Sequence, residues 1–173
     1  MKKILIIIFF FHFISTTNAQ VIKNTSVSKT ELIKAATEIM NGAKTCALIT
    51  QDKNGLSSVR MMDPFPPEKD LSIWFGTNPK SRKVKQLKNN KNVTVYYRDK
   101  DDSGYVIIYG KAELINDQKS KEKYWKNTWK SFYPNNKDSY LLIKVTPLKM
   151  EIVSPSRNIT GLAETWEPPT LFF

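Results

Sequence analysis

Short strand-like segments joined by turns of only a few residues constrain the fold of this chain more than any other feature. The clearest pair, 45–50 and 56–62, flanks a polar turn that ends in Asn54-Gly55. Such a turn joins antiparallel strands, whereas parallel strands need a crossover of a dozen or more residues. Further strands are predicted at 70–75, 92–98, 105–115 and 140–145, and the last pattern can be followed to Val153. These six or so strands together predict a largely antiparallel barrel.

Three helices are predicted at the periphery of the barrel. They are expected at 29–43, at 80–89 and from Asp117 to about Phe132. The first begins with a capping box, in which Ser28 caps the helix and Glu31 reaches back, and the second follows Asn78-Pro79, a helix cap with proline at the first helical position. The regular strand–helix alternation of a doubly wound fold is absent. The expected class is therefore mainly β with peripheral helices (α+β).

The N-terminal segment has the pattern of a signal peptide. Lys2 and Lys3 precede an apolar run at 4–14, and Thr17 and Ala19 suit the small-residue positions of a cleavage site after Ala19. A membrane-spanning helix needs about 20 apolar residues, which this run does not reach. We therefore expect a mature chain that is periplasmic or secreted and has no membrane span. The expected organisation is a signal peptide at 1–19, a polar lead-in at 20–27, one domain at 28–153 and an irregular tail at 154–173.

Two singletons restrict the chemistry. The one histidine, His12, lies in the predicted signal peptide, so Ser-His-Asp catalysis, Cys-His catalysis and histidine-based metal or haem ligation are excluded from the mature chain. No metal site is predicted. The one cysteine, Cys46, lies in an apolar strand and is expected to be a small buried side chain. A cofactor must then carry any chemistry.

Basic and hydroxyl side chains gather between residues 60 and 83. Thr77, Ser81, Arg82 and Lys83 surround the start of the second predicted helix, and Arg60 ends a strand. A helix N-terminus favours an anion, and an arginine can clamp a phosphate with two hydrogen bonds. The alternative interpretation is a solvated basic helix, because the chain carries a net charge of +11, or +9 after Lys2 and Lys3 leave with the signal peptide.

Three stretches resemble the pyridoxamine-phosphate-oxidase-like split-barrel flavoproteins, in particular the small general-stress-protein branch. They are Ala47-Leu48-Ile49-Thr50-Gln51-Asp52 with Gly55, Arg60-Met61-Met62, and Trp74-Phe75-Gly76-Thr77 with Ser81-Arg82-Lys83-Val84. The order of motifs continues downstream through Gly110-Lys111-Ala112 to Phe132-Tyr133-Pro134, so that the similarity covers about 28–145.

The resemblance implies a six-stranded, antiparallel split β-barrel that forms a homodimer with FMN at the subunit interface. By position, Arg60 and the backbone of Met61 and Met62 would flank the isoalloxazine and ribityl chain, Phe75 and Thr77 would border the flavin, and Ser81, Arg82 and Lys83 would hold its phosphate. Trp129 would reach the partner's flavin, or else it belongs to the core, as its helical spacing favours.

The resemblance leaves the activity open. The tail has no histidine and only Arg157, which disfavours pyridoxine-phosphate oxidation. The first hypothesis is an exported FMN-dependent oxidoreductase of unknown substrate, for which Tyr96, Tyr97 and Asp63 are available but unassigned acids or bases. The second is a non-catalytic carrier of flavin or another phosphate-bearing ligand. The third is a polyanion-binding surface, although no specific nucleic-acid site is predicted. The segment 165–169 would either close over a ligand or strap down the terminus.

Overall fold

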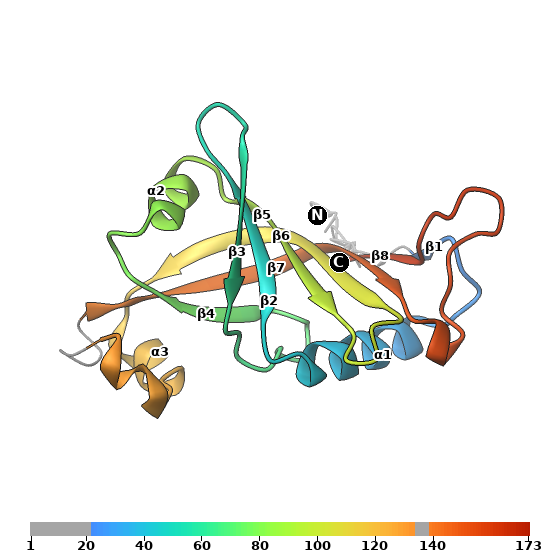
Figure 1. The fold of residues 1–173 in the computed structure, drawn as a ribbon, viewed down its shortest axis with the longest axis horizontal. Coiled ribbons are helices and arrows are strands. Elements are labelled where there is room, and N and C mark those ends of the chain that lie inside the picture. The colour runs from blue at the N-terminus through green and yellow to red at the C-terminus, as the bar shows by residue number, and fades with distance from the viewer. Residues whose placement is uncertain (1–21, 134–138) are drawn as a thin grey trace, which may run out of the picture.

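The long strands form one antiparallel sheet that curls around the core (Figure 1). The computed structural model describes residues 22–133 and 139–173. Within them the strands are β1 (Ile22–Lys23), β2 (Cys46–Gln51), β3 (Ser57–Met62), β4 (Ile73–Thr77), β5 (Asn92–Arg98), β6 (Tyr105–Ile115), β7 (Leu141–Val153) and β8 (Thr170–Phe172). Their order is β1-β8-β7-β6-β5-β2-β3, and β4 pairs with β7. The six predicted strands correspond to β2–β7, and β1 and β8 are additional.

The long strand β7 brings the two halves of the barrel together. One edge of β7 pairs with β6, while the other pairs first with β4, from Leu141 to Val145, and then with β8, from Lys149 to Glu151. Between β3 and β4 the ring is joined by an isolated bridge, Pro64 to Phe75, beside which Phe65 N donates to Trp74 O at 2.9 Å. Proline has no N–H to donate to a ladder, so regular pairing between β3 and β4 does not extend beyond this bridge.

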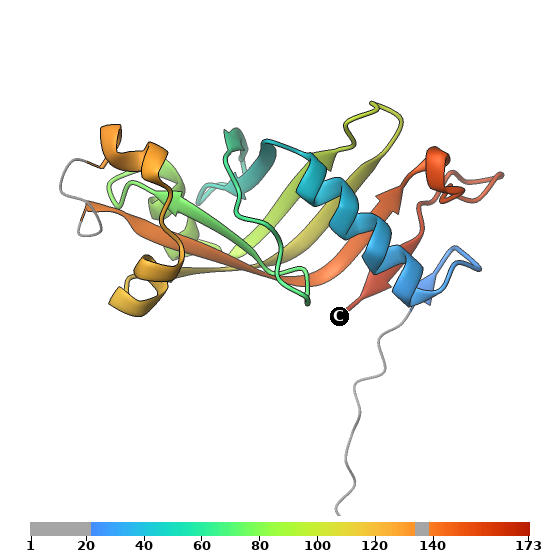
Figure 2. The same cartoon turned by 90° about the horizontal axis from the view of Figure 1, so that it is seen from below.

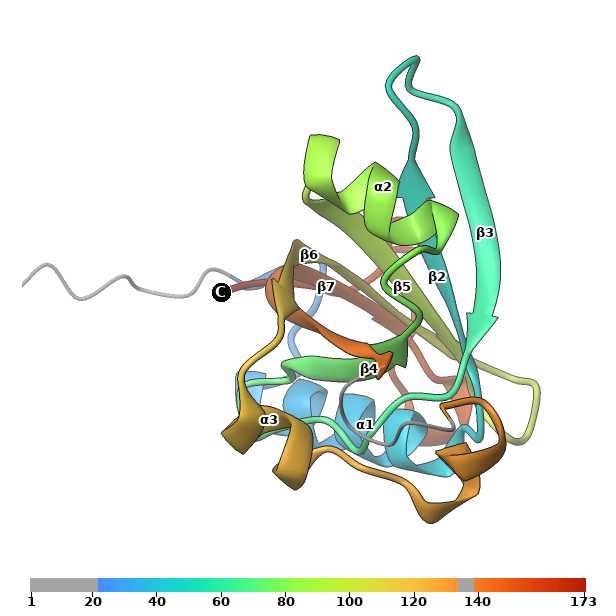
Figure 3. The ribbon, with the colours of Figure 1, turned by 90° about the vertical axis from the view of Figure 1, so that its left-hand side faces the viewer.

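Two helices lie on opposite sides of the barrel, α1 (Lys29–Gly42) below it and α2 (Arg82–Asn89) above it in Figure 3. The predicted capping box of α1 is confirmed, with Glu31 N donating to Ser28 Oγ at 3.3 Å and Ser28 N donating to Glu31 Oε2 at 3.1 Å. Figure 2 shows α1 running across the barrel. Its buried stripe recurs at helical spacing and joins the main core: Leu32, Ala35, Ala36, Ile39 and Met40.

A second, aromatic core lies between β4, β7 and the segment that follows β6. The Trp74 and Tyr124 rings stack at 4.2 Å, and Trp129 and Tyr140 pack edge to face at 5.7 Å. This packing breaks the helix predicted from Asp117 to about Phe132: α3 ends at Lys123 (Gln118–Lys123) and a 3₁₀ helix follows at Asn127–Ser131. Tyr124 leaves the helix so that its ring covers Trp74 and its hydroxyl donates to Glu68 Oε1 at 2.6 Å.

The other predicted boundaries differ by small amounts. The second helix begins at Arg82, because Ser81 rather than Asn78 is its N-cap residue, and Asn78 Oδ1 instead accepts from Lys80 N at 2.8 Å. Cys46 is buried and free, as predicted. The predicted signal peptide and Pro134 lie outside the described residues. Within 22–133 and 139–173, no helix is long and apolar enough to cross a membrane.

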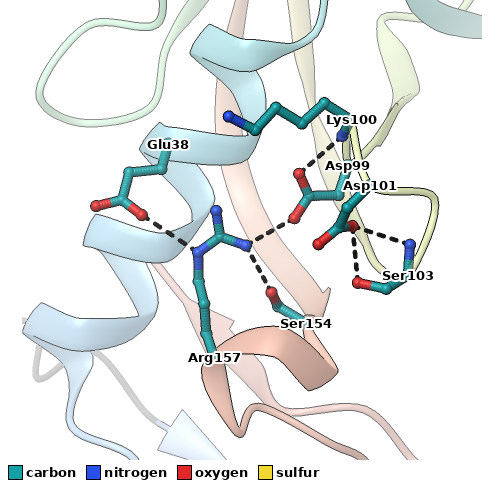
Figure 4. A network of polar contacts seen from close by, with 7 residues as sticks. All are labelled: Glu38, Asp99, Lys100, Asp101, Ser103, Ser154 and Arg157. Atoms are coloured by element: carbon teal, nitrogen blue, oxygen red, sulfur yellow. Dashed lines mark hydrogen bonds and ion pairs between the residues drawn. The ribbon is translucent and has the colours of Figure 1, made fainter.

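The tail is more ordered than the predicted irregular segment. It contains a 3₁₀ helix at Pro155–Arg157 and ends in β8. Figure 4 shows how Arg157 anchors it: Nη1 donates to Asp99 Oδ2 at 2.6 Å and to Ser154 Oγ at 2.8 Å, and Nε donates to Glu38 Oε2 at 3.2 Å. These bonds join the start of the tail to α1 and to the β5–β6 turn. The role of 165–169 stays a prediction.

Candidate functional site

A pocket of about 590 Å³ opens where the ends of β3 and β4, the start of α2 and the 3₁₀ helix Asn127–Ser131 meet. Its walls are of two kinds. The polar wall contains Asp63, Thr77, Asn78 and Lys83, and the apolar wall contains Met61, Met62, Gly76, Trp129, Phe132 and Tyr133. The volume lies in the usual range for small-ligand sites, which runs from about 300 to 1,000 Å³. A second hollow, of about 430 Å³, lies beside Arg157, but there the guanidinium is already paired with Asp99 and Glu38.

Two hydroxyls and an ammonium group meet at the polar end of the pocket. Lys83 Nζ donates to Thr77 Oγ1 at 3.1 Å, and the Thr77 and Ser81 hydroxyl oxygens lie 3.2 Å apart. Ser81 is the N-cap residue of α2, yet its side chain makes no capping hydrogen bond. Because the Ser81 side chain accepts no hydrogen bond from the helix, the N–H groups of the first turn of α2 remain suited to an anionic acceptor.

Arg60 reaches the same region from β3. Its Nη1 donates to Thr50 Oγ1 at 2.6 Å, and its Nη2 donates to Gln86 Oε1 at 3.0 Å. A guanidinium has five N–H donors, so three of them form no hydrogen bond with the described residues. The half-buried group is therefore held by Thr50 and Gln86 and keeps unpaired donors.

The positive charges of Arg60, Arg82 and Lys83 are not balanced by carboxylates. Among the described residues, none of the three forms an ion pair. Burial, followed by the nearby charge of Arg82, lowers the pKa of Arg60, and burial, followed by the charge of Arg60, lowers the pKa of Lys83. Both shifts mean that the protein disfavours these charges as they stand. A bound anion would offset that penalty, and a phosphate supplies several oxygen acceptors for charged donors.

The structure brings most of the predicted site residues together. Met61, Met62, Thr77, Lys83 and Trp129 line the pocket, and Ser81 contacts its polar end through the Thr77 hydroxyl. Arg60 bonds to Thr50 and Gln86 outside the lining, but it is near enough for its charge to lower the pKa of Lys83. Arg82 is exposed beside them.

Phe75 is the exception, because its ring is fully buried in the main core rather than at the pocket. Trp129 is both a core residue, 7% exposed, and a pocket wall. The position agrees with the prediction that Trp129 belongs to the core. Contact between Trp129 and a partner's flavin stays a prediction.

The unassigned acid and base candidates fall in three different places. Tyr97 is fully buried in the core, where burial raises the pKa of its hydroxyl, and Tyr96 lies on the outer face of β5. Asp63 lines the pocket, but its Oδ1 is 2.5 Å from Lys126 Nζ. In the described part of the chain, His, Cys, Asp and Glu side chains do not gather in threes as a metal site requires.

Sequence reasoning missed the polar side chains behind Arg60 and the aromatic wall. Thr50 and Gln86 occupy positions that the strand and helix patterns reserve for buried apolar residues, at 1% and 9% exposure. A polar residue in a buried periodic position is the signal that would have found them. Phe132 and Tyr133 follow the 3₁₀ helix Asn127–Ser131. Their place was not predicted, because the sequence predicts one continuous helix where α3 ends at Lys123.

The model of the family described as "Pyridoxamine 5'-phosphate oxidase like" matches residues 31–162. The chain belongs to this family. The pyridoxamine 5'-phosphate oxidase-like assignment and the antiparallel barrel class expected from the sequence are thereby confirmed, with two more strands than predicted.

Solved structures of this family have the same fold. General stress protein 26 from Bacillus anthracis is 29% identical, with a TM-score of 0.62 over 71% of this chain and 94% of that chain. A protein related to general stress protein 26 from Clostridium acetobutylicum is 23% identical, with a TM-score of 0.65 over 73% and 90% of the two chains. An FMN-binding, pyridoxamine 5'-phosphate oxidase-related protein from Nostoc punctiforme is 11% identical, with a TM-score of 0.60 over 86% and 99%. No curated protein matches this chain.

Proposed function

We propose that this protein binds FMN, with the phosphate at the junction of β3, β4 and α2. The observation that carries the proposal is the group of three cations, Arg60, Arg82 and Lys83, which have no carboxylate partners in the described chain. Lys83 of this group donates to Thr77 Oγ1, beside the Ser81 hydroxyl. The Nostoc punctiforme protein of the same fold is described as FMN-binding, which supports flavin over other phosphate esters.

Each part of the site would have a distinct task. Lys83, Ser81 and the first turn of α2 would bind the phosphate, and Arg60 would add the donors that Thr50 and Gln86 leave unused. The apolar wall, from Met61 to Trp129, would bind the uncharged part of the ligand and exclude water from it. When bound, FMN supplies hydride and electron transfer, which the side chains of this chain cannot perform.

The activity that follows is that of an exported FMN-dependent oxidoreductase. Export rests on the signal-peptide pattern at 1–19. One observation favours a carrier as the second candidate: Asp63, the carboxylate of the pocket wall, is already ion-paired with Lys126. A carrier would bind the flavin tightly and shield it from reductants.

We also propose that the protein is a homodimer with the site at the interface. Three large apolar side chains are exposed on the outer face of β3 and β5, near the pocket: Val59 at 66%, Met61 at 64% and Tyr96 at 37%. Contiguous apolar surface of this kind favours a protein partner. Because Met61 belongs both to this face and to the pocket wall, dimerisation would enclose the ligand.

Flavin retention tests the proposal. The purified protein is mixed with FMN, desalted and examined for the visible flavin absorption band. We expect wild type to retain the band, and the double variant Arg60→Ala/Lys83→Ala to lose it. Lys85→Ala/Lys88→Ala is the matched control, because it removes the same charge from the exposed side of α2. No retained flavin in wild type would refute FMN binding. Reduction of the bound flavin by NAD(P)H would then favour the oxidoreductase, and resistance to reduction would favour the carrier.

A further inference from the structure

Gln86 is a buried amide on the inner side of α2, where the neighbouring buried residues Val84 and Leu87 are apolar. Burying an amide is costly unless its hydrogen bonds are formed. Its partners therefore indicate why a polar residue occupies this position.

The Gln86 amide bonds with both strands of the β2–β3 pair. Its Oε1 accepts from Thr50 Oγ1 at 2.6 Å and from Arg60 Nη2 at 3.0 Å, and its Nε2 donates to Ser58 Oγ at 3.0 Å. Arg60 Nη1 also donates to Thr50 Oγ1 at 2.6 Å, which closes a ring of three residues. Because a guanidinium only donates, the amide oxygen must face Arg60, and this fixes the orientation of the amide.

We propose that Gln86 is a positioning residue for phosphate binding, because it holds the Arg60 guanidinium so that N–H groups left unpaired can bind the ligand phosphate. The inference rests on the proposed function. Thr50 and Ser58 are opposite one another in the β2–β3 ladder and provide the polar floor on which the amide rests. The network thus joins the strand that carries Arg60 to the helix that follows Ser81 and carries Lys83.

The Gln86 hydrogen bonds do more than attach α2 to the sheet, because one of them fixes Arg60. An arginine on a strand can take several rotamers, and two hydrogen bonds from one side select one of them before the ligand arrives. Fixing the group in advance removes an ordering cost from binding. Asn90 offers the contrast: its Nδ2 donates to Gln51 Oε1 at 3.1 Å, so it also ties the end of α2 to β2, but it does not bond to Arg60.

The test compares FMN with riboflavin, which has the same ring and no phosphate. Dissociation constants are measured by flavin fluorescence for wild type, Gln86→Met and the control Asn90→Ala. We expect Gln86→Met to weaken FMN binding about tenfold, as the loss of hydrogen bonds to a charged group implies, and to leave riboflavin binding unchanged. Asn90→Ala should keep the preference for FMN. A general packing defect in Gln86→Met would weaken both ligands equally and would overturn the proposal.

Arg60→Ala supplies the second arm. If Gln86 acts through Arg60, Gln86→Met should have no further effect on FMN affinity in the Arg60→Ala background; additive losses would contradict the inference. Should Gln86→Met fail to fold, Thr50→Val removes the other hydrogen bond to Arg60 and should lower the preference for FMN in the same way. Wild type without any preference for FMN would refute the proposed function itself, whereas an unchanged preference in Gln86→Met and Thr50→Val would refute only the role of Gln86.

Discussion

The indole of Trp129 lies directly on the backbone of Gly76, so closely that a Cβ at position 76 would stand 2.5 Å from Trp129 Cζ3. This contact joins the 3₁₀ helix Asn127–Ser131 to β4 at the wall of the pocket. Glycine is needed here for space, because an added methyl group would occupy the place of the ring. The contact thereby couples the shape of the pocket to the aromatic core.

Gly76→Ala should displace the Trp129 ring and destabilise the protein by about 1–3 kcal/mol, as overpacking does. Thermal unfolding and tryptophan fluorescence would measure the two effects. Gly42→Ala is the control, since a Cβ at position 42 would meet only Lys100 Cδ, at 3.9 Å. Equal melting temperatures for Gly76→Ala and wild type would show that the ring moves aside freely.

Binding of FMN should weaken as the pH rises through the alkaline range. The pKa of Lys83 is lowered by burial and then by the charge of Arg60, so its ammonium loses its proton at a lower pH than an ordinary lysine does. Its attraction for phosphate is lost with it. Lys83→Arg, which stays charged, should flatten the dependence. The measurement is FMN affinity against pH, with riboflavin in parallel to account for ionisation of the flavin ring. A decline shared by wild type and Lys83→Arg would assign the effect to another group.

Arg157→Met should destabilise the protein by about 3–5 kcal/mol, because it leaves a buried charge uncompensated. Its partner Asp99 has a side chain only 3% exposed. The double variant Arg157→Met/Asp99→Asn should recover part of the loss, since it removes that charge as well. Denaturant unfolding of the two variants and of Asp99→Asn completes the cycle. FMN affinity should change little, because the tail lies at the far end of the barrel from α2 and α3 (Figure 1). If Arg157→Met were as stable as wild type, the Arg157 hydrogen bonds would contribute nothing to stability.

Val59→Glu should convert the proposed dimer into a monomer and lower FMN retention, because it places a charge in the apolar face of β3. Sedimentation measures the mass, and the flavin band measures retention. Leu162→Glu, at a residue 41% exposed in the tail, should change neither. Sedimentation of Val59→Glu as a dimer would exclude this face from the interface.

Local patterns determined much of the fold. The Ser28 and Glu31 capping box, the strands at 92–98 and 105–115 and the burial of Cys46 depend on neighbours in the sequence, and all three were predicted. The cluster of Thr77, Ser81 and Lys83 was also visible, because a strand end and a helix start lie only a few residues apart.

The tertiary structure decided what depends on distant contacts. Stacking on Trp74 ends α3 at Lys123, and pairing with β7 makes β8 a strand. The Phe75 ring enters the core, and Gln86 meets Arg60 from 26 residues away. A residue pattern records periodicity along one element, but the partner that a side chain meets across the barrel depends on how the sheet closes. For this reason the sequence identified the candidate ligand-binding residues, whereas only the folded barrel revealed the buried network that holds Arg60.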